Sequence, residues 1–176
     1  GSRVADIYGA NLDPAVISCA TNQLGCACQQ KISKTVEQLA AVKLSTFVSC
    51  KKGALKAGAN AAAALAACVN DAGTAGSIKA DTKGKIAKTL AGLNAGITKS
   101  CDTPGVTAGA FPGSCTLLTG AALGACLDTR VECRVCQAIN EMDGIFVNCD
   151  LFDNGVADAS CASGNGPTPT PTLTPT

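Results

Sequence analysis

Residues 22–50 read NQLGCACQQKISKTVEQLAAVKLSTFVSC and decide the fold, because an apolar stripe of helical spacing runs between closely placed cysteines. From Cys28 to about Lys56 the apolar residues fall largely three or four positions apart, the spacing of one face of an amphipathic helix. The stripe consists of Ile32, Val36, Leu39, Phe47 and Cys50. We therefore predict a long helix over residues 28–56, broken or bent by GALKAGAN at 53–60.

Three further helical segments are predicted downstream. A short alanine-rich helix covers residues 61–70 and ends at NDAG, and a helix over 79–101 has the clearest pattern. Its apolar residues step by four, three, four and four, with lysines mostly on the other side: Ile86, Leu90, Leu93, Ile97 and Cys101. A loop at 102–115 leads to a helical segment from Leu117 to about Met142, broken near its start by Gly120 and Gly124. Residues 143–161 are expected to mix a short apolar run with turns.

Large side chains are scarce for a chain of 176 residues. It has 31 alanines and 12 cysteines against 39 larger apolar residues, with no tryptophan, one tyrosine and four phenylalanines. Alanine buries little area, whereas a large apolar side chain contributes about 1.5–3 kcal/mol when fully buried. We expect disulfides to supply the missing stability, at about 2–4 kcal/mol each.

The cysteines are even in number and dispersed, which is typical of disulfides formed in an oxidising compartment. They are Cys19, Cys26, Cys28, Cys50, Cys68, Cys101, Cys115, Cys126, Cys133, Cys136, Cys149 and Cys161. Antiparallel packing of residues 28–50 against 79–101 would bring Cys101 to the end that carries Cys26 and Cys28, which we expect to enter two different bridges. Cys50 and Cys68 would flank the short connection through Gly53 and Gly58. The sequence leaves the full pairing open, because twelve cysteines allow too many combinations.

The cysteines could instead bind a metal ion, zinc or copper(I), or form a redox-active pair. A zinc site needs four ligands, and the chain offers one C-x-x-C at Cys133 and Cys136, one C-x-C and no histidine. Copper(I) is the stronger metal candidate, because Cys126, Cys133 and Cys136 share one helical face, yet Cys50 stands alone near a helix end. A redox pair would require a βαβ context, which is not evident. Structural disulfides are therefore preferred, and no metal or other cofactor is expected.

Catalysis and nucleic-acid binding find little support. Histidine, the commonest general base, is absent, and so are the motifs of hydrolases and phosphate-binding loops. Around Gly155, the residues Asp150, Asp153, Asn154 and Asp158 faintly resemble a calcium loop, but Phe152 occupies a ligand position, so we interpret the segment as a turn. The lysine-rich helix lacks stacking aromatics. We expect a protein that is not an enzyme and does not bind nucleic acid.

The two ends differ from the middle of the chain. Residues 1–18 are predicted to form an extended arm, with Pro14 at a first helical turn after Asp13, and residues 19–161 a disulfide-rich helical domain. The tail at 162–176 alternates proline and threonine, favours polyproline II and is a candidate for O-glycosylation at Thr168, Thr170, Thr172, Thr174 and Thr176. The sequence shows no signal peptide, and we expect a chain that is mature, processed or expressed without its leader. It has no apolar stretch of membrane-spanning length.

Charge is divided unevenly between the two halves. Residues 1–101 hold 12 Lys/Arg and 5 Asp/Glu, a balance of +7, and residues 102–176 hold 2 and 8, a balance of −6, which together give the net +1. Either the halves pack on each other within one molecule, or a basic face of one subunit meets an acidic face of the next. The sequence does not separate these interpretations, since both use the same screened attraction.

Several segments resemble a group of cysteine-rich exported proteins of environmental bacteria that have no established activity. They are CACQQKISKTVEQLAAVKLSTFVSCKKG, KIAKTLAGLNAGITKSC, FPGSC, CRVCQAI, CDLFDNGVADASC and the Pro-Thr tail. The resemblance covers roughly residues 26–176 and implies export and disulfide bonding. In general style the chain is also similar to small disulfide-rich helical lipid or sterol carriers, but its C-x-C and C-x-x-C spacing does not match theirs.

We predict an all-α fold, a disulfide-stapled bundle of about four helices with an extended N-terminal arm and a Pro-Thr tail. The first functional hypothesis is a non-enzymatic structural protein, secreted or at the cell surface, that assembles with itself into a filament or surface layer. Extended ends, opposite charge in the two halves and covalent stability motivate it. The alternatives are a binding module for a small apolar, lipid-like or sterol-like ligand held between helices lined by Leu, Ile and Ala, and a thiolate store for copper or zinc.

Overall fold

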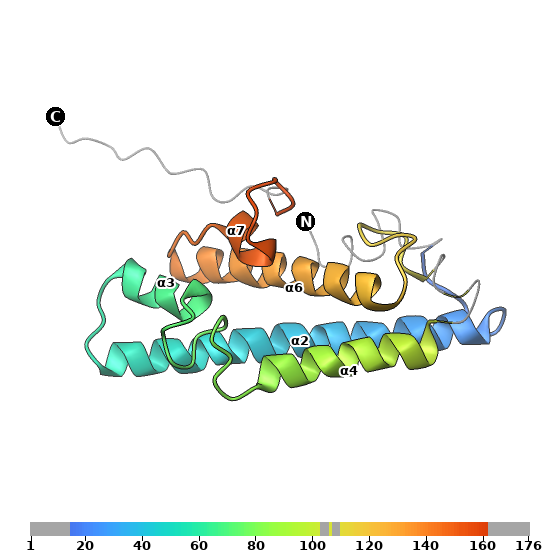
Figure 1. Cartoon of the computed structure of the whole chain (residues 1–176), viewed down its shortest axis with the longest axis horizontal. Helices are drawn as coiled ribbons and strands as arrows, with labels where there is room; N and C mark the ends of the chain where they lie inside the picture. Colours follow the sequence, from blue (N-terminus) through green and yellow to red (C-terminus); the bar gives the residue numbers. More distant parts are fainter. Residues whose placement is uncertain (1–14, 103–105, 107–109, 162–176) are drawn as a thin grey trace.

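The computed structural model describes residues 15–102, 106 and 110–161. The helices with defined bounds are α2 (Gln23–Lys56), α3 (Ala62–Asn70), α4 (Lys85–Ser100), α6 (Gly120–Asp143) and α7 (Cys149–Asn154). The described ranges contain no strand. The predicted all-α class with disulfides is therefore confirmed, with the short helix α7 added to the four expected helical segments (Figure 1).

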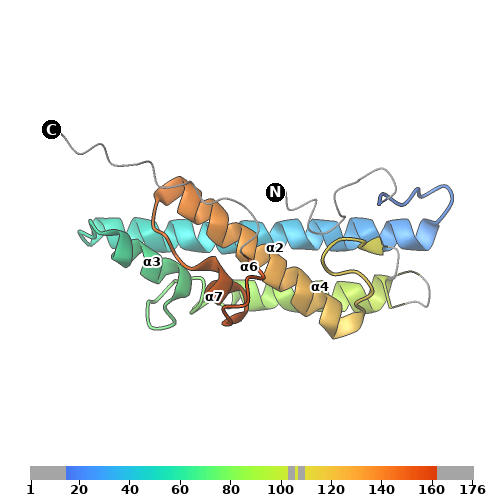
Figure 2. The same cartoon turned by 90° about the horizontal axis from the view of Figure 1, so that it is seen from above.

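The helices form two layers. Helices α2 and α4 lie side by side and antiparallel, and α3 folds back along the C-terminal half of α2 (Figures 1 and 2). Helix α6 crosses this pair obliquely on one face, in contact with both, and α7 packs against α6. The core lies where the three long helices meet, so the apolar stripes predicted in residues 28–50 and 79–101 face each other. Its largest fully buried apolar side chains include Phe47, Phe111, Ile32, Leu39, Leu93, Ile97, Leu123, Leu127 and Ile139.

Helix α2 begins five residues earlier than predicted. The Asn22 side chain accepts a hydrogen bond from the Gly25 backbone N–H at 2.9 Å, so it serves as the N-cap and the helix starts at Gln23. The predicted break at residues 53–60 is confirmed, although Gly53 itself still lies inside the helix. The helix ends at Lys56, and Gly58 then takes a left-handed backbone with φ of 87°.

Helix α4 begins at Lys85, six residues later than predicted, because residues 79–84 form turns. Asp81 and Gly84 have left-handed backbones with φ of 38° and 62°. The Asp81 carboxylate accepts hydrogen bonds from the backbone N–H groups of Ile86 (3.1 Å) and Ala87 (2.8 Å). The Asp81 carboxylate therefore accepts hydrogen bonds from backbone N–H groups in the first turn of α4, where the helix dipole stabilises negative charge.

The start of α6 also differs from the prediction. Gly120 is its first residue, but Gly124 does not break it. A Cβ atom at Gly124 would lie 1.9 Å from Asn94 Oδ1, so this glycine lets α6 approach α4 closely. In residues 143–161, where a short apolar run mixed with turns is predicted, α7 forms a short helix. Its N-cap Asn148 accepts hydrogen bonds from the backbone N–H groups of Asp150 and Leu151.

The last residues of the predicted N-terminal arm pack on α2. The buried Gln29 amide accepts a hydrogen bond from Ile17 N–H at 2.9 Å and donates to the Ala15 carbonyl at 2.6 Å and the Ala110 carbonyl at 2.8 Å. One side chain thus holds two distant segments on the helix. Residues 1–14, with the Asp13–Pro14 helix start, and the tail at 162–176, with its threonines, lie outside the described residues.

Candidate functional site

All twelve cysteines are joined in six disulfides. The pairs are Cys19–Cys26, Cys28–Cys101, Cys50–Cys68, Cys115–Cys126, Cys133–Cys161 and Cys136–Cys149. Cys26 and Cys28 enter two different bridges, as their position at the helix end predicted. Cys28–Cys101 closes one end of the α2/α4 pair, and Cys50–Cys68 fastens α3 to α2 near the other end.

The two cysteines of the C-x-x-C motif are anchors for the C-terminal segment. Three residues apart, Cys133 and Cys136 lie on neighbouring positions of α6 and are bonded to Cys161 and Cys149, respectively. Residues 149–161, which include α7, are thus attached to α6 at both ends. Thiolate storage of metal would require free sulfur atoms, and this pairing leaves every sulfur bonded.

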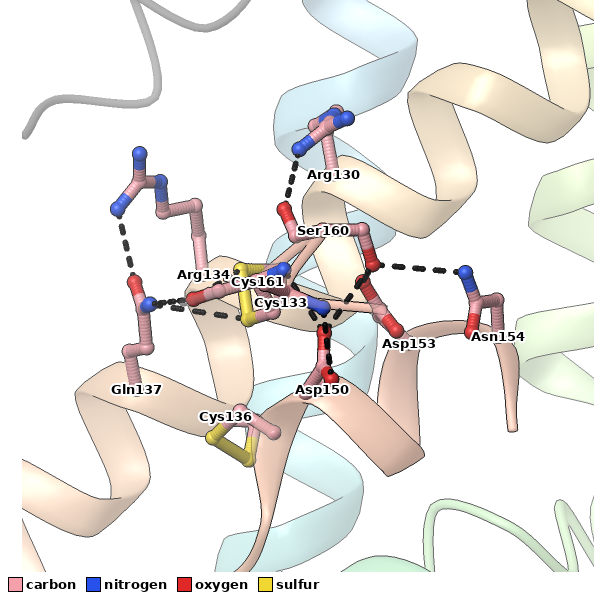
Figure 3. Close-up of a disulfide and its surroundings, with 12 residues drawn as sticks. Arg130, Cys133, Arg134, Cys136, Gln137, Asp150, Asp153, Asn154, Ser160 and Cys161 are labelled. Atoms are coloured by element: carbon pink, nitrogen blue, oxygen red, sulfur yellow. Dashed lines mark hydrogen bonds between the residues drawn. A yellow bond between two sulfur atoms is a disulfide. The ribbon is translucent and has the colours of Figure 1, made fainter. Parts of the chain in front are cut away.

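The acidic residues that faintly resembled a calcium loop hold this C-terminal segment in place (Figure 3). Asp150 accepts hydrogen bonds from the backbone N–H groups of Ala159 (3.0 Å) and Cys161 (3.2 Å). The Ser160 hydroxyl donates to Asp153 Oδ2 at 2.8 Å, and the Ser160 carbonyl accepts from Arg130 Nη1 at 2.7 Å. Within the described residues, no group of three or more acidic or cysteine side chains is arranged to hold a metal ion.

The carboxyl groups in this segment differ in their environments. Burial raises the pKa of Asp153, and the hydrogen bond from Ser160 partly opposes that effect. Hydrogen bonds with Ser160 lower the pKa of the exposed Asp158, whose Oδ1 accepts from the Ser160 backbone N–H at 2.9 Å. Asp158 therefore stays ionised on the surface.

A buried ion cluster joins α2 to α6. The Lys43 side chain is 1% exposed, and its Nζ lies 2.9 Å from Asp128 Oδ1 and 2.6 Å from Glu132 Oε1. Burial raises the pKa of Glu132, an effect opposed by the Lys43 ammonium group. This cluster is not among the predicted sites, although the sequence contains a signal for it: Lys43 lies four residues from both Leu39 and Phe47, in the middle of the apolar stripe.

A second ion pair, between Lys51 and Asp143, lies further along the same two helices. Every ion pair among the described residues therefore links basic α2 to acidic α6. The two oppositely charged halves pack on each other within one molecule, which agrees with the first of the two interpretations of the charge pattern.

A groove of about 550 Å³ lies between α2 and the segment that leads into α4. We call it the α2 groove. One wall is the face of α2 formed by Ser45, Thr46, Ser49, Cys50, Gly53, Ala54 and Ala57. The other wall is formed by Thr74, Ala75, Gly76, Asp81, Thr82, Lys83 and Lys85. Its lining differs from the predicted one of Leu, Ile and Ala between helices, because side chains of the core fill that interior.

A shallower hollow of about 420 Å³ lies on another face of α2. It is lined by Val48, Lys51, Lys52, Leu55 and Lys56. Val48 and Leu55 are exposed large apolar side chains, so this part of α2 presents both apolar and basic groups to the surroundings.

Comparison of the chain with known protein families, with curated proteins and with solved structures finds no match. None of the helices in the described part of the chain combines the length and the apolar character that crossing a membrane requires.

Proposed function

We propose that this chain is a non-enzymatic extracellular structural protein that assembles with copies of itself. Six disulfides support an oxidising compartment, where such bonds form and persist. In this proposal the stapled helical domain is the rigid body. The Pro-Thr tail, with Thr168, Thr170, Thr172, Thr174 and Thr176 as candidate glycosylation sites, extends from it.

Two stretches of the chain with exposed apolar side chains, one basic and one acidic, carry the proposal. On α2, Val48 (57% exposed) and Leu55 (49%) lie beside Lys52 and Lys56, and we call these four residues the basic patch. On the C-terminal segment, Leu151 (47%) and Val156 (56%) lie near Asp150 and Asp158 in sequence, and we call these four the acidic patch. None of these charged residues belongs to the ion pairs found among the described residues.

A contact between the basic patch of one copy and the acidic patch of another is more favourable than a contact between two identical patches. Two basic patches would repel each other, whereas a basic patch against an acidic patch combines apolar burial with charge attraction. A contact between two different surfaces leaves one of each free on the growing assembly, so it generates a ring or an open filament. This geometry favours a ring or a filament over a simple dimer.

Electron microscopy and sedimentation of the oxidised chain test the proposal. We expect polymers at low salt that shorten towards 1 M salt, where the screening length falls to about 3 Å. The double variant Lys52→Glu/Lys56→Glu should reduce assembly, while Lys31→Glu/Lys34→Glu, the same charge change on exposed residues of the same helix, should not. Monodisperse small particles of the unaltered chain at high concentration would refute self-assembly.

A second candidate function is binding of a small apolar ligand, and the α2 groove is the observation that favours it. Its volume of about 550 Å³ is within the range of roughly 300–1,000 Å³ typical of small-molecule sites. Organic extraction of the protein isolated from its native source tests this alternative. A lipid or sterol recovered in stoichiometric amount would favour binding, and its absence from material that sediments as a polymer would favour assembly.

A further inference from the structure

We propose that the α2 groove binds a small amphiphile with an anionic head group and a short apolar chain. This inference rests on the second candidate function, ligand binding in the α2 groove, and deepens it by naming the ligand class. It is independent of self-assembly, because the groove and the basic patch use different residues of α2.

The groove is open because small side chains line the α2 wall. Over three turns, the wall includes Thr46, Gly53, Ala54 and Ala57, none of them larger than threonine. A Cβ atom built at Gly53 would meet nothing within 4 Å, so the middle of this wall faces open space. The half-cystine Cys50, bonded to Cys68, fixes the same stretch of α2 covalently.

Both methyl groups and hydroxyl groups line the walls. Ala54 and Ala57 on α2 and Ala75 on the facing segment offer apolar surface, while Ser49 and Thr82 add hydroxyl groups. None of the described residues that line the groove is aromatic, which argues against flat polycyclic ligands that stack on rings and favours a narrow alkyl chain.

The lysines in the lining select the head group. Lys83 and Lys85 line the groove on either side of Gly84, where α4 begins, and neither belongs to the ion pairs among the described residues. Asp81 is the acidic residue in the lining, and both its oxygens accept hydrogen bonds from α4 backbone amides. Two lysine ammonium groups therefore remain for an anionic head, whereas a cationic head would be repelled.

Titration calorimetry with three ligands of equal chain length, below their micelle concentrations, tests the charge requirement. Decanoate and decyl phosphate represent two sources of the same anionic chemistry, and decanol is the neutral analogue. We expect one saturable site for the anions and about tenfold weaker binding of decanol. The variant Lys83→Gln/Lys85→Gln should weaken decanoate binding to the level of decanol without changing the affinity for decanol.

A filled groove tests the location. Gly53→Leu places a side chain into the open space and should abolish decanoate binding while the protein stays folded, as thermal unfolding would verify. Gly92→Leu is the matched control, since a Cβ atom at Gly92, on α4, also meets nothing within 4 Å and Gly92 does not line the groove. Equal affinity for decanoate and decanol would overturn the anionic requirement. Unchanged binding by Gly53→Leu, or no binding of any of the three ligands, would overturn the site.

Discussion

Lys43 Nζ lies 2.6 Å from Glu132 Oε1, so a buried ammonium group on α2 meets a carboxylate on α6 across the centre of the fold. Asp128, one helical turn earlier on α6, is the second partner at 2.9 Å. The three charges fix one register of α6 on α2, because sliding either helix by a turn would leave a buried charge without its partner. The apolar core alone would discriminate less sharply between such registers.

Replacement of the lysine should destabilise the protein strongly. Lys43→Met keeps most of the side-chain volume but leaves Asp128 and Glu132 without their cation, and we expect a loss of about 3–5 kcal/mol in the free energy of unfolding. Urea unfolding followed by circular dichroism measures the loss. Lys52→Met, an exposed position on the same helix, is the control and should change stability by less than about 0.5 kcal/mol. Equal effects of the two variants would contradict the structural role of the cluster.

The same cluster predicts a pH dependence. Burial raises the pKa of Glu132 above its ordinary value of 4.5, against the opposing effects of Lys43 and Lys79 and with a smaller contribution from Asp128 in the same direction. Between pH 4.5 and the raised value, the folded protein binds more protons at Glu132 than the unfolded chain, so this group's contribution to stability falls as pH rises. Glu132→Gln should remove that fall.

Urea unfolding of both proteins at several pH values above 4.5 provides the measurement. Relative to the unaltered protein, the free energy of unfolding of Glu132→Gln should decline less, or rise more, with increasing pH. Parallel pH profiles would show that the pKa of Glu132 does not differ between the folded and unfolded states.

Two helical glycines should respond in opposite ways to alanine. Gly92→Ala adds a methyl group where nothing lies within 4 Å, so we expect it to stabilise the protein by about 0.5–1 kcal/mol through helix propensity. Gly124→Ala would place its Cβ 1.9 Å from Asn94 Oδ1, so the Asn94 side chain would have to move in the contact between α6 and α4. Overpacking of this kind typically costs about 1–3 kcal/mol. Thermal unfolding distinguishes the two, and a stabilised Gly124→Ala would mean that the Asn94 side chain is not held against Gly124.

The disulfides should contribute different amounts to the free energy of unfolding, because they close loops of different length. Cys28–Cys101 spans a sequence separation of 73 and Cys115–Cys126 one of 11. Loop-closure entropy predicts losses of about 4.4 and about 2.8 kcal/mol when each pair is replaced by alanines. Urea unfolding of the two double variants without reductant tests this order, and a larger loss for Cys115→Ala/Cys126→Ala would contradict it.

The long helices could be predicted because their apolar residues repeat at helical spacing over several turns, as from Ile86 to Ile97. The first residues of these helices could not be predicted, because side-chain hydrogen bonds determine where each helix begins. The Asn22 side chain caps α2 at an earlier residue than predicted. Asp81 lies in the turn before α4 and accepts hydrogen bonds from its first backbone N–H groups, so α4 begins later than predicted. Helix α7, with six residues, is too short to show a period. Local spacing indicated that Cys26 and Cys28 would enter separate bridges.

The remaining features depend on how segments that are distant in the sequence pack together, so the sequence alone does not predict them. The partners of Cys133 and Cys136 depend on the path of residues 144–161, which spacing alone does not specify. The α2 groove depends on the segment after α3, where Ile78 N–H donates to the Cys68 carbonyl and brings residues 74–85 beside α2. The wall of small residues on α2 was visible in the sequence, but the facing segment was assigned in part to a helix.

Peptide mapping of the unreduced protein by mass spectrometry is the most direct test of a fold fastened by sulfur–sulfur bonds. Digestion and alkylation under denaturing conditions should find no free thiol and should recover Cys28 linked to Cys101, Cys50 to Cys68, and Cys133 to Cys161, with the other three pairs as described. Twelve alkylated cysteines, or a link such as Cys26 to Cys101, would contradict it.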